Sequence, residues 1–250
     1  RPGQVDVRLS ALTAIREEWL CDLFPGSFRE QRRVYYDTVG KRMLAERQRC
    51  FRDLVIGADR AGDVTHDEAA AALAAEVVAG RLVMKRWDRK VEQWIARVNL
   101  VAEHCPELGV PPIGATDRPA LIEQICHGAH SAKAVKPREV WPVLQQWLSQ
   151  EQTAAVKAYA PEQVTLENGR KPRLHYDDPS GPYIAMRVQE LYDTQKTPTI
   201  CNGSVRVKVR ILAPNQRPVQ ITDDLASFWQ NGYDRVKKDL RGRYPKHEWR

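Results

Sequence analysis

The sequence predicts an α+β protein with a β-rich N-terminal part, a helical middle and a mixed α/β C-terminal domain. Two periodicities predict this class. Apolar residues alternate with polar ones, as in half-buried strands, within residues 30–58 and most clearly within 203–212. Between residues 65 and 150 the apolar spacing is instead that of helices with one buried face. We therefore divide the chain into residues 1–64, 65–150 and 151–250.

The N-terminal part is expected to hold short strands and one short helix. Val5, Val7 and Leu9 alternate with polar residues, which predicts a strand over residues 4–13. Residues 15–24 read as a helix that ends at Pro25-Gly26. Two or three antiparallel strands follow over residues 30–58, and we expect Gly40 to supply the positive φ of a tight turn between them.

The middle part is expected to be a small helical bundle. Residues 66–80 are alanine-rich with no helix breaker. An amphipathic helix is predicted over about 86–104, and two further helices over 120–127 and 138–149. Tryptophans recur on the apolar faces of these helices, so we interpret them as core residues and not as exposed stacking platforms.

The C-terminal part begins with a helix and continues with strands. The helix is predicted over residues 152–160, followed by two paired strands around an Asn168-Gly169 turn. Residues 182–188 are compatible with either strand or helix, and residues 189–193 look helical. The strand over 203–212 is the clearest in the sequence, with valines and isoleucine on one side and basic residues on the other.

The last stretch, residues 213–249, has the features of one organised unit. Pro214 and Pro218 exclude a helix at its start, which makes the entry extended. Thr222 or Asp223 is expected to cap a helix that runs from about 225 to 240 with one buried apolar face. Gly242 ends that helix, and a basic tail follows.

Composition favours an anionic partner. The 250 residues include 39 basic and 32 acidic side chains, a formal net charge of +7. Nucleic acid is the usual partner of a basic chain, although a solvated basic surface with no ligand is an equally good interpretation of so small a surplus. The five scattered cysteines predict neither disulfides nor a zinc site, and fit a reducing cytoplasm. No apolar run is long enough to span a membrane, and no signal peptide is visible.

Motifs that would support independent catalysis are missing from the printed sequence. It contains no Gly-x-x-x-x-Gly-Lys-Ser/Thr phosphate loop and no Asp-Glu-Ala-His motif. The nearest segment, Asp67-Glu68-Ala69-Ala70, lacks the histidine and is interpreted as a helix start. Cys126-His127-Gly128-Ala129-His130 has no second ligand pair at a zinc-like spacing. We therefore predict no catalytic residue, no metal and no cofactor in this chain.

Binding is the activity that the residues favour. Basic residues of the 203–212 strand, together with those of the terminal helix and tail, are candidates for one phosphate-contacting patch, with Tyr244 and Trp249 as stacking residues. The alternative is that these side chains cover apolar surface and pair with acids such as Asp234 and Asp239. The candidate residues are Arg206, Lys208, Arg210, Lys237, Lys238, Arg241, Arg243, Tyr244 and Lys246.

The terminal stretch resembles the C-terminal end of the HrpB-type ATP-dependent helicases, bacterial members of the DEAH-box RNA helicase group. The resemblance is carried by Arg217-Pro218-Val219-Gln220-Ile221-Thr222-Asp223-Asp224-Leu225-Ala226-Ser227-Phe228-Trp229 and by Tyr233-Asp234-Arg235-Val236-Lys237-Lys238-Asp239-Leu240-Arg241-Gly242-Arg243-Tyr244-Pro245-Lys246-His247. Shorter matches extend it over about 151–249. The sequence departs at Glu248 and Arg250, where the family usually carries prolines.

The resemblance implies that Arg217, Pro218, Asp223, Phe228, Trp229, Tyr233 and Pro245 form the structural motif of this domain. It also implies that residues 13–25 correspond to the end of an OB-like module. Because the sequence starts at Arg1 and not at methionine, we expect a piece of a longer chain. The upstream motor domains would bind ATP and Mg²⁺, and this accessory region would contact RNA or another single strand. The alternative is a scaffold that docks a protein and no nucleic acid.

Overall fold

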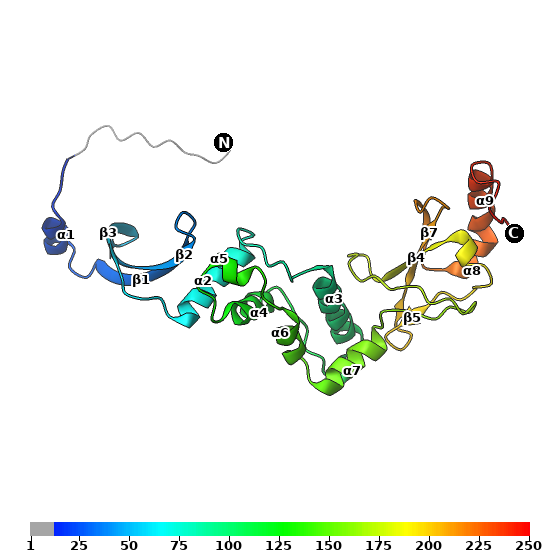
Figure 1. The fold of residues 1–250 in the computed structure, drawn as a ribbon, viewed down its shortest axis with the longest axis horizontal. Coiled ribbons are helices and arrows are strands. Elements are labelled where there is room, and N and C mark those ends of the chain that lie inside the picture. Colours follow the sequence, from blue (N-terminus) through cyan, green and yellow to red (C-terminus); the bar gives the residue numbers. More distant parts are fainter. Residues whose placement is uncertain (1–12) are drawn as a thin grey trace.

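The structure is a computed structural model that describes residues 13–250. Its elements follow one another along the longest axis, from a sheet at one end, through helices, to a second group of strands and helices at the other (Figure 1). The α+β class predicted from the sequence is confirmed. The predicted strand over residues 4–13 falls almost wholly outside the described residues.

The N-terminal part is one helix and one antiparallel sheet. Strands lie in the order β1-β2-β3, and the predicted hairpin is confirmed, with Tyr36 opposite Met43 near its turn. The strands are longer than predicted: burial alternates along most of β2, whereas residues 29–33 of β1 are all exposed. The elements are α1 (Glu17–Leu23), β1 (Phe28–Asp37), β2 (Arg42–Phe51) and β3 (Leu54–Arg60).

The turn between β1 and β2 uses a different residue from the one predicted. Lys41 adopts the left-handed conformation, with φ of 53°, whereas Gly40 does not. A side chain at position 40 would displace the Asp37 carboxylate, because an added Cβ would overlap one of its oxygens. That carboxylate accepts hydrogen bonds from the backbone amides of Val39 and Gly40, both at 3.0 Å. The prediction that Gly40 supplies the positive φ was therefore wrong.

A salt bridge joins the sheet to the helical middle. Arg32 on β1 donates from Nε to Glu68 Oε1 at 2.7 Å, and it also donates to the carbonyls of Ala61 and Asp63. Glu68 is the third residue of α2 (His66–Val78) and completes a capping box with Thr65. The Arg32 hydrogen bond and the Thr65 amide lower the pKa of Glu68 to about 2. One carboxylate thus both starts a helix and holds the neighbouring sheet.

The helical middle contains more and shorter helices than predicted. The helix predicted over 138–149 is present but shorter, as α6 (Trp141–Gln146), because Pro142 lies in its first turn and would break a helix that began three residues earlier. Ser149 then caps the next helix through a second capping box. Besides α2, the elements are α3 (Arg89–His104), η1 (Pro106–Leu108), α4 (Asp117–Cys126), α5 (Ala132–Val135), α6 (Trp141–Gln146) and α7 (Gln150–Tyr159).

The C-terminal part contains a mixed three-stranded sheet in the order β4-β7-β8 and a two-stranded sheet of β5 and β6. Strands β4 and β7 are parallel, whereas β7 and β8 are antiparallel. The strands are β4 (Tyr183–Arg187), β5 (Thr199–Ile200), β6 (Val205–Arg206), β7 (Lys208–Leu212) and β8 (Pro218–Thr222). A 3-10 turn, η2 (Val188–Glu190), follows β4 where residues 189–193 had looked helical.

Two of the predicted strand segments are less regular in the structure than predicted. The strand over 203–212 is divided at Val207 into β6 and β7, yet its alternation is confirmed, since Val205, Val207, Val209 and Ile211 are all buried. The two segments around Asn168-Gly169 lie side by side but are too irregular to form strands. They are joined by one β-bridge between Gln163 and Arg173 and by backbone hydrogen bonds from Val164 to Pro172 and from Leu166 to Arg170.

The terminal helix is interrupted by a π-helical turn. It consists of α8 (Leu225–Ser227), the π turn η3 (Phe228–Gly232) and α9 (Tyr233–Arg241). The wider turn lets Phe228 and Tyr233, five residues apart, both point into the core, where they are 2% and 8% exposed. The cap is Asp224, whose Oδ1 accepts from the Ser227 amide at 3.0 Å, and not the predicted Thr222 or Asp223.

We expect Gly232→Ala to lower the free energy of unfolding by about 1–2 kcal/mol. An added Cβ would lie 3.0 Å from Cδ2 of the buried Phe228 ring and 3.1 Å from Nε2 of Gln220 on β8. Gly242→Ala is the matched control, because nothing lies within 4 Å of its added Cβ and its φ of −65° is helical. Urea unfolding followed by circular dichroism measures both. Equal stability of the two variants would show that η3 is not closely packed.

Within residues 13–250, no helix combines the length and the apolar character that crossing a membrane requires. The five cysteines are free thiols, and all except Cys21 are buried. Burial raises the pKa of Cys126 to about 11, so that this thiol stays protonated near neutral pH.

Candidate nucleic-acid interface

The cations of β7 point away from the core of the C-terminal part. Lys208 and Arg210 are half-buried and alternate with the buried Val209 and Ile211. The guanidinium of Arg210 lies over the ring of Tyr183, with Cζ 3.5 Å from the ring centroid, and pairs with the carboxylate of Asp178. Its charge is thus already matched inside the protein.

Asp178 is held in its ionised form by several donors. The backbone amide and hydroxyl of Ser180 donate to it at 2.7 and 2.6 Å, and Arg210 adds its charge. These contacts, led by those from Ser180, lower the pKa of Asp178. Arg206 on β6 is exposed, and neither it nor Lys208 forms a salt bridge within the described residues. Of the three strand cations, Arg210 is therefore the one with a structural role.

Lys237, the first cation of α9 in the candidate set, also has an internal partner. Its Nζ donates to the backbone carbonyl of Arg250 at 2.6 Å and lies 5.8 Å from the ring centroid of Tyr233. The side chain of Arg250 in turn pairs with Asp193 and lies over the ring of Tyr192. Lys237 therefore fixes the C-terminal tail against the domain.

The remaining candidate cations of α9 and the tail are exposed, and no salt bridge among the described residues involves them. Lys238 and Arg241 lie on the side of α9 opposite the buried Val236 and Leu240, and Arg243 and Lys246 lie in the tail. Among the described residues, none of these four forms a salt bridge within 4.0 Å, and neither Asp234 nor Asp239 pairs with them. We name Lys238, Arg241, Arg243 and Lys246 the terminal cation group.

The two aromatic candidates pack against the domain. Tyr244 and Trp249 are both half-buried at the edge of the hydrophobic core. The Trp249 indole donates to the backbone carbonyl of Tyr244 at 2.9 Å, and the Tyr244 amide donates to the Leu240 carbonyl at 2.8 Å. Each ring leaves only part of its surface to a ligand.

The motif residues divide into core and surface. Phe228 and Tyr233 are buried, and Trp229 donates its indole N–H to the Thr194 carbonyl at 2.7 Å. The Tyr233 hydroxyl lies 2.8 Å from that of Tyr192, and burial with this hydrogen bond raises the pKa of Tyr233. The other motif residues, Arg217, Pro218, Asp223 and Pro245, are exposed.

The structure thus gives the nine candidate residues different roles, since Arg210 and Lys237 have partners inside the protein and the terminal cation group has none among the described residues. Cations of β7 and cations of α9 each alternate with buried apolar residues of their own element and so point away from the core. The internal roles of Arg210 and Lys237 depend on Asp178 and Arg250, which are distant in sequence, so the local pattern gave no sign of them.

Histidines of the helical middle come together in a way that the sequence did not suggest. His130 Nε2 lies 2.9 Å from His66 Nδ1, and His127 Nε2 lies 3.2 Å from a carboxylate oxygen of Asp67. Even so, the part of the chain that the structure describes contains no group of three or more histidine, cysteine or acidic side chains arranged to hold a metal.

A cavity that the sequence did not predict lies between the helical middle and the C-terminal part. Its volume is about 610 Å³, and residues of α3, α6 and α7 and of segment 162–176 line it. Trp94 and Trp141, interpreted from the sequence as core residues, are both in its wall. Trp94 is indeed buried, at 7% exposure, whereas Trp141 is half-buried.

Comparisons with known proteins agree with one another. A family model described as ATP-dependent helicase C-terminal (HrpB_C) matches residues 121–250. The chain is 31% identical over 172 residues to the ATP-dependent RNA helicase HrpB of Escherichia coli (strain K12), a match that covers 67% of this chain and 21% of that protein.

Two solved structures are also similar. A crystal structure of the E. coli DExH-box NTPase HrpB matches with a TM-score of 0.68 and 26% identity, over 95% of this chain and 30% of that one. A crystal structure of the Escherichia coli DEAH/RHA helicase HrpB matches with a TM-score of 0.62 and 26% identity, over 90% and 29% of the two chains. The chain therefore spans less than a third of the length of these relatives.

Proposed function

The chain belongs to the HrpB-type family of ATP-dependent helicase C-terminal regions, and from this premise we propose that it is a non-motor region of such a helicase that contacts single-stranded nucleic acid, RNA in the first instance. The observation that carries the proposal is the terminal cation group. Arg173, Arg210 and Arg250 of the C-terminal part each lie within 4.0 Å of a carboxylate, whereas these four exposed cations have no such partner among the described residues.

Unpaired cations are suited to phosphates for a physical reason. A cation that already pairs with a carboxylate must lose that partner before it binds a phosphate, whereas an exposed and unpaired one exchanges only water and counterions. Lys238 and Arg241 are three residues apart on one helical face, and Arg243 and Lys246 continue from its end. This arrangement supports contact with several successive phosphates of one strand.

The chemistry of strand movement belongs, in this proposal, to another part of the helicase. The relatives are several times longer than this chain, and the printed sequence has neither the phosphate loop nor the Asp-Glu-Ala-His motif. We propose that upstream motor domains bind ATP and Mg²⁺ in a cytoplasmic enzyme, and that this region holds the strand that they move. No residue of this chain is assigned a catalytic role.

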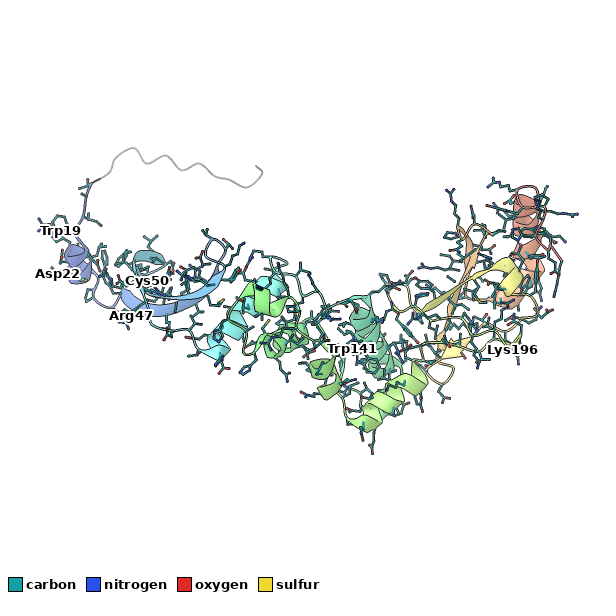
Figure 2. All side chains as sticks on the ribbon, viewed as in Figure 1. Trp19, Asp22, Arg47, Cys50, Trp141 and Lys196 are labelled. Atoms are coloured by element: carbon teal, nitrogen blue, oxygen red, sulfur yellow. The ribbon has the colours of Figure 1, made fainter. Side chains whose placement is uncertain are left out.

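The N-terminal part supports a contact with protein. Several apolar side chains of α1 and β3 are exposed, among them Leu23 at 71%, Leu54 at 67% and Trp19 at 49%. Figure 2 shows Trp19 at the end of the molecule, beside the sheet. We propose that this surface completes an OB-like module with the upstream chain. A scaffold that docks a separate protein and binds no nucleic acid is the second candidate, and the same exposed residues favour it.

The test is fluorescence anisotropy of the chain with a labelled single-stranded RNA between 50 and 200 mM salt. We expect affinity to fall steeply with salt, and we expect the variant K238Q/R241Q/R243Q to bind at least about tenfold more weakly at 50 mM. Removing three phosphate contacts is expected to reduce the slope of log affinity against log salt by about 2. Lys237 is left unchanged because it holds the Arg250 carbonyl.

The matched control is K85Q/K133Q/K136Q, which removes the same charge from exposed lysines of the helical middle. It is expected to retain wild-type affinity within about twofold, apart from a small general effect of net charge. A wild-type chain that binds no RNA even at 50 mM salt would contradict the proposal and favour the protein-docking scaffold.

A further inference from the structure

The cavity between the helical middle and the C-terminal part has walls of two chemical kinds. Trp94 on α3 and Trp141 on α6 meet edge to face, with ring centroids 6.4 Å apart. Figure 2 shows Trp141 where the helices approach the C-terminal part. Across the cavity, segment 162–176 contributes His175, whose ring stacks on that of Tyr183 with centroids 4.9 Å apart. An aromatic wall of this kind suits a planar ligand.

Basic side chains outnumber acidic ones around this cavity. Its lining includes five of them, Arg89, Lys90, Arg97, Lys157 and Arg173, against the two carboxylates of Asp88 and Glu162. Asp88 is engaged as the cap of α3, where it accepts from the Lys90 and Val91 amides. Glu162 is engaged by Arg97 and lies 3.9 Å from Arg173.

Lys90 and Lys157 are the available cations of the rim. Both are exposed, and neither forms a salt bridge among the residues that the structure describes. They come from different helices, Lys90 from the first turn of α3 and Lys157 from the last turn of α7. His175 adds no charge near neutral pH, because burial and then the Arg89 guanidinium lower its pKa. The rim therefore favours an anion.

Two polar groups in the cavity wall have no partner. The indole N–H of Trp94 and the side-chain amide nitrogen of Gln93 are both buried and without a hydrogen-bond acceptor. Trp94 as a whole is only 7% exposed. Both nitrogens lie below the accessible surface of the wall, so they would meet a ligand only after the two side chains move.

We propose that this cavity binds one nucleotide unit, with its base against Trp94 and Trp141 and its phosphate at Lys90 and Lys157. A volume of about 610 Å³ is ample for a single nucleotide. The proposal deepens the proposed function, because it gives a strand held at the terminal cation group a second point of contact. A free nucleotide presents the same base and phosphate, so the two sources of the ligand require separate tests.

The first test crosslinks the chain to a ten-nucleotide RNA that contains 4-thiouridine and maps the adducts by mass spectrometry. We expect adducts on peptides that contain Trp94 or Trp141. In anisotropy with the same RNA, K90Q/K157Q is expected to bind about tenfold more weakly, and K133Q/K136Q, with equal charge loss, to bind within about twofold of the wild type. All four lysines are exposed, so neither variant is expected to unfold.

A parallel arm titrates adenosine monophosphate and uridine monophosphate into the chain and repeats the crosslinking with 4-thiouridine monophosphate. Adducts with the RNA alone identify a strand as the ligand, and adducts with the monophosphate identify a free nucleotide. The absence of cavity adducts in both arms would overturn the inference. If RNA still bound and K238Q/R241Q/R243Q still weakened it, the proposed function would stand without this site.

Discussion

Replacing Arg97 by alanine is expected to lower the free energy of unfolding by about 3 kcal/mol. The Arg97 side chain is only 7% exposed, and its Nε donates to the Ala160 carbonyl at 2.6 Å. Its guanidinium also lies near the ring of Trp94, with Cζ 5.2 Å from the centroid, and reaches Glu162 at 3.4 Å. The substitution leaves the Ala160 carbonyl unpaired and opens a void between α3 and the end of α7.

Arg89→Ala is the matched control for this prediction, because the same residue type is removed from the same helix. Arg89 is 63% exposed in its side chain and pairs with Asp177 at 2.9 Å, so its loss is expected to cost less than about 1 kcal/mol. Urea unfolding of both variants, without RNA, measures the difference. Equal losses would show that the contact between Arg97 and Ala160 does not join the helical middle to the C-terminal part.

Arg97 also illustrates why parts of this fold were not predictable from the sequence. In the amphipathic pattern of α3 an arginine belongs to the exposed face, and its burial depends on a carbonyl 63 residues away. Local periodicity contains no information about a partner at that distance. The same holds for the cavity, whose walls come from α3, α6, α7 and segment 162–176.

Periodicity was sufficient where burial alternates along one element. The residues from Val205 to Ile211 alternate as predicted, and α3 lies within the range assigned to it. Predictions that depend on a single turn or cap were wrong. The positive φ of the hairpin turn belongs to Lys41 and not to Gly40, and the cap of the terminal helix is Asp224 and not Thr222 or Asp223. Several residue types satisfy such positions, and tertiary contacts decide among them.

The candidate interface was predictable in composition but not in arrangement. Basic residues of the terminal helix and tail were identified from the sequence, and four of them are exposed and unpaired in the structure. Which cations are engaged internally depends on Asp178 for Arg210 and on the Arg250 carbonyl for Lys237. These partners lie 32 and 13 residues away, beyond the reach of a helical or strand pattern.

Phe228→Ala is expected to cost about 3–5 kcal/mol and to loosen the whole terminal helix. The ring is 2% exposed and lies 5.0 Å from the Trp229 centroid and 6.3 Å from that of Tyr233. Since Phe228 begins the π turn, its removal takes away the contact that lets residues 228 and 233 share one buried face. The hydroxyl pair of Tyr192 and Tyr233, which also binds the Glu248 carbonyl, is expected to separate with it.

Hydrogen exchange localises the effect of Phe228→Ala to particular amides. Amides of α9 are expected to lose protection in this variant, and RNA affinity is expected to fall with them, because the terminal cation group depends on the position of α9. Phe24→Ala is the control: the same atoms are removed from a ring that is 41% exposed, at an expected cost of at most about 1 kcal/mol. Unchanged protection of α9 after loss of the Phe228 ring would show that the helix is held by its other contacts, and RNA affinity should then also be unchanged.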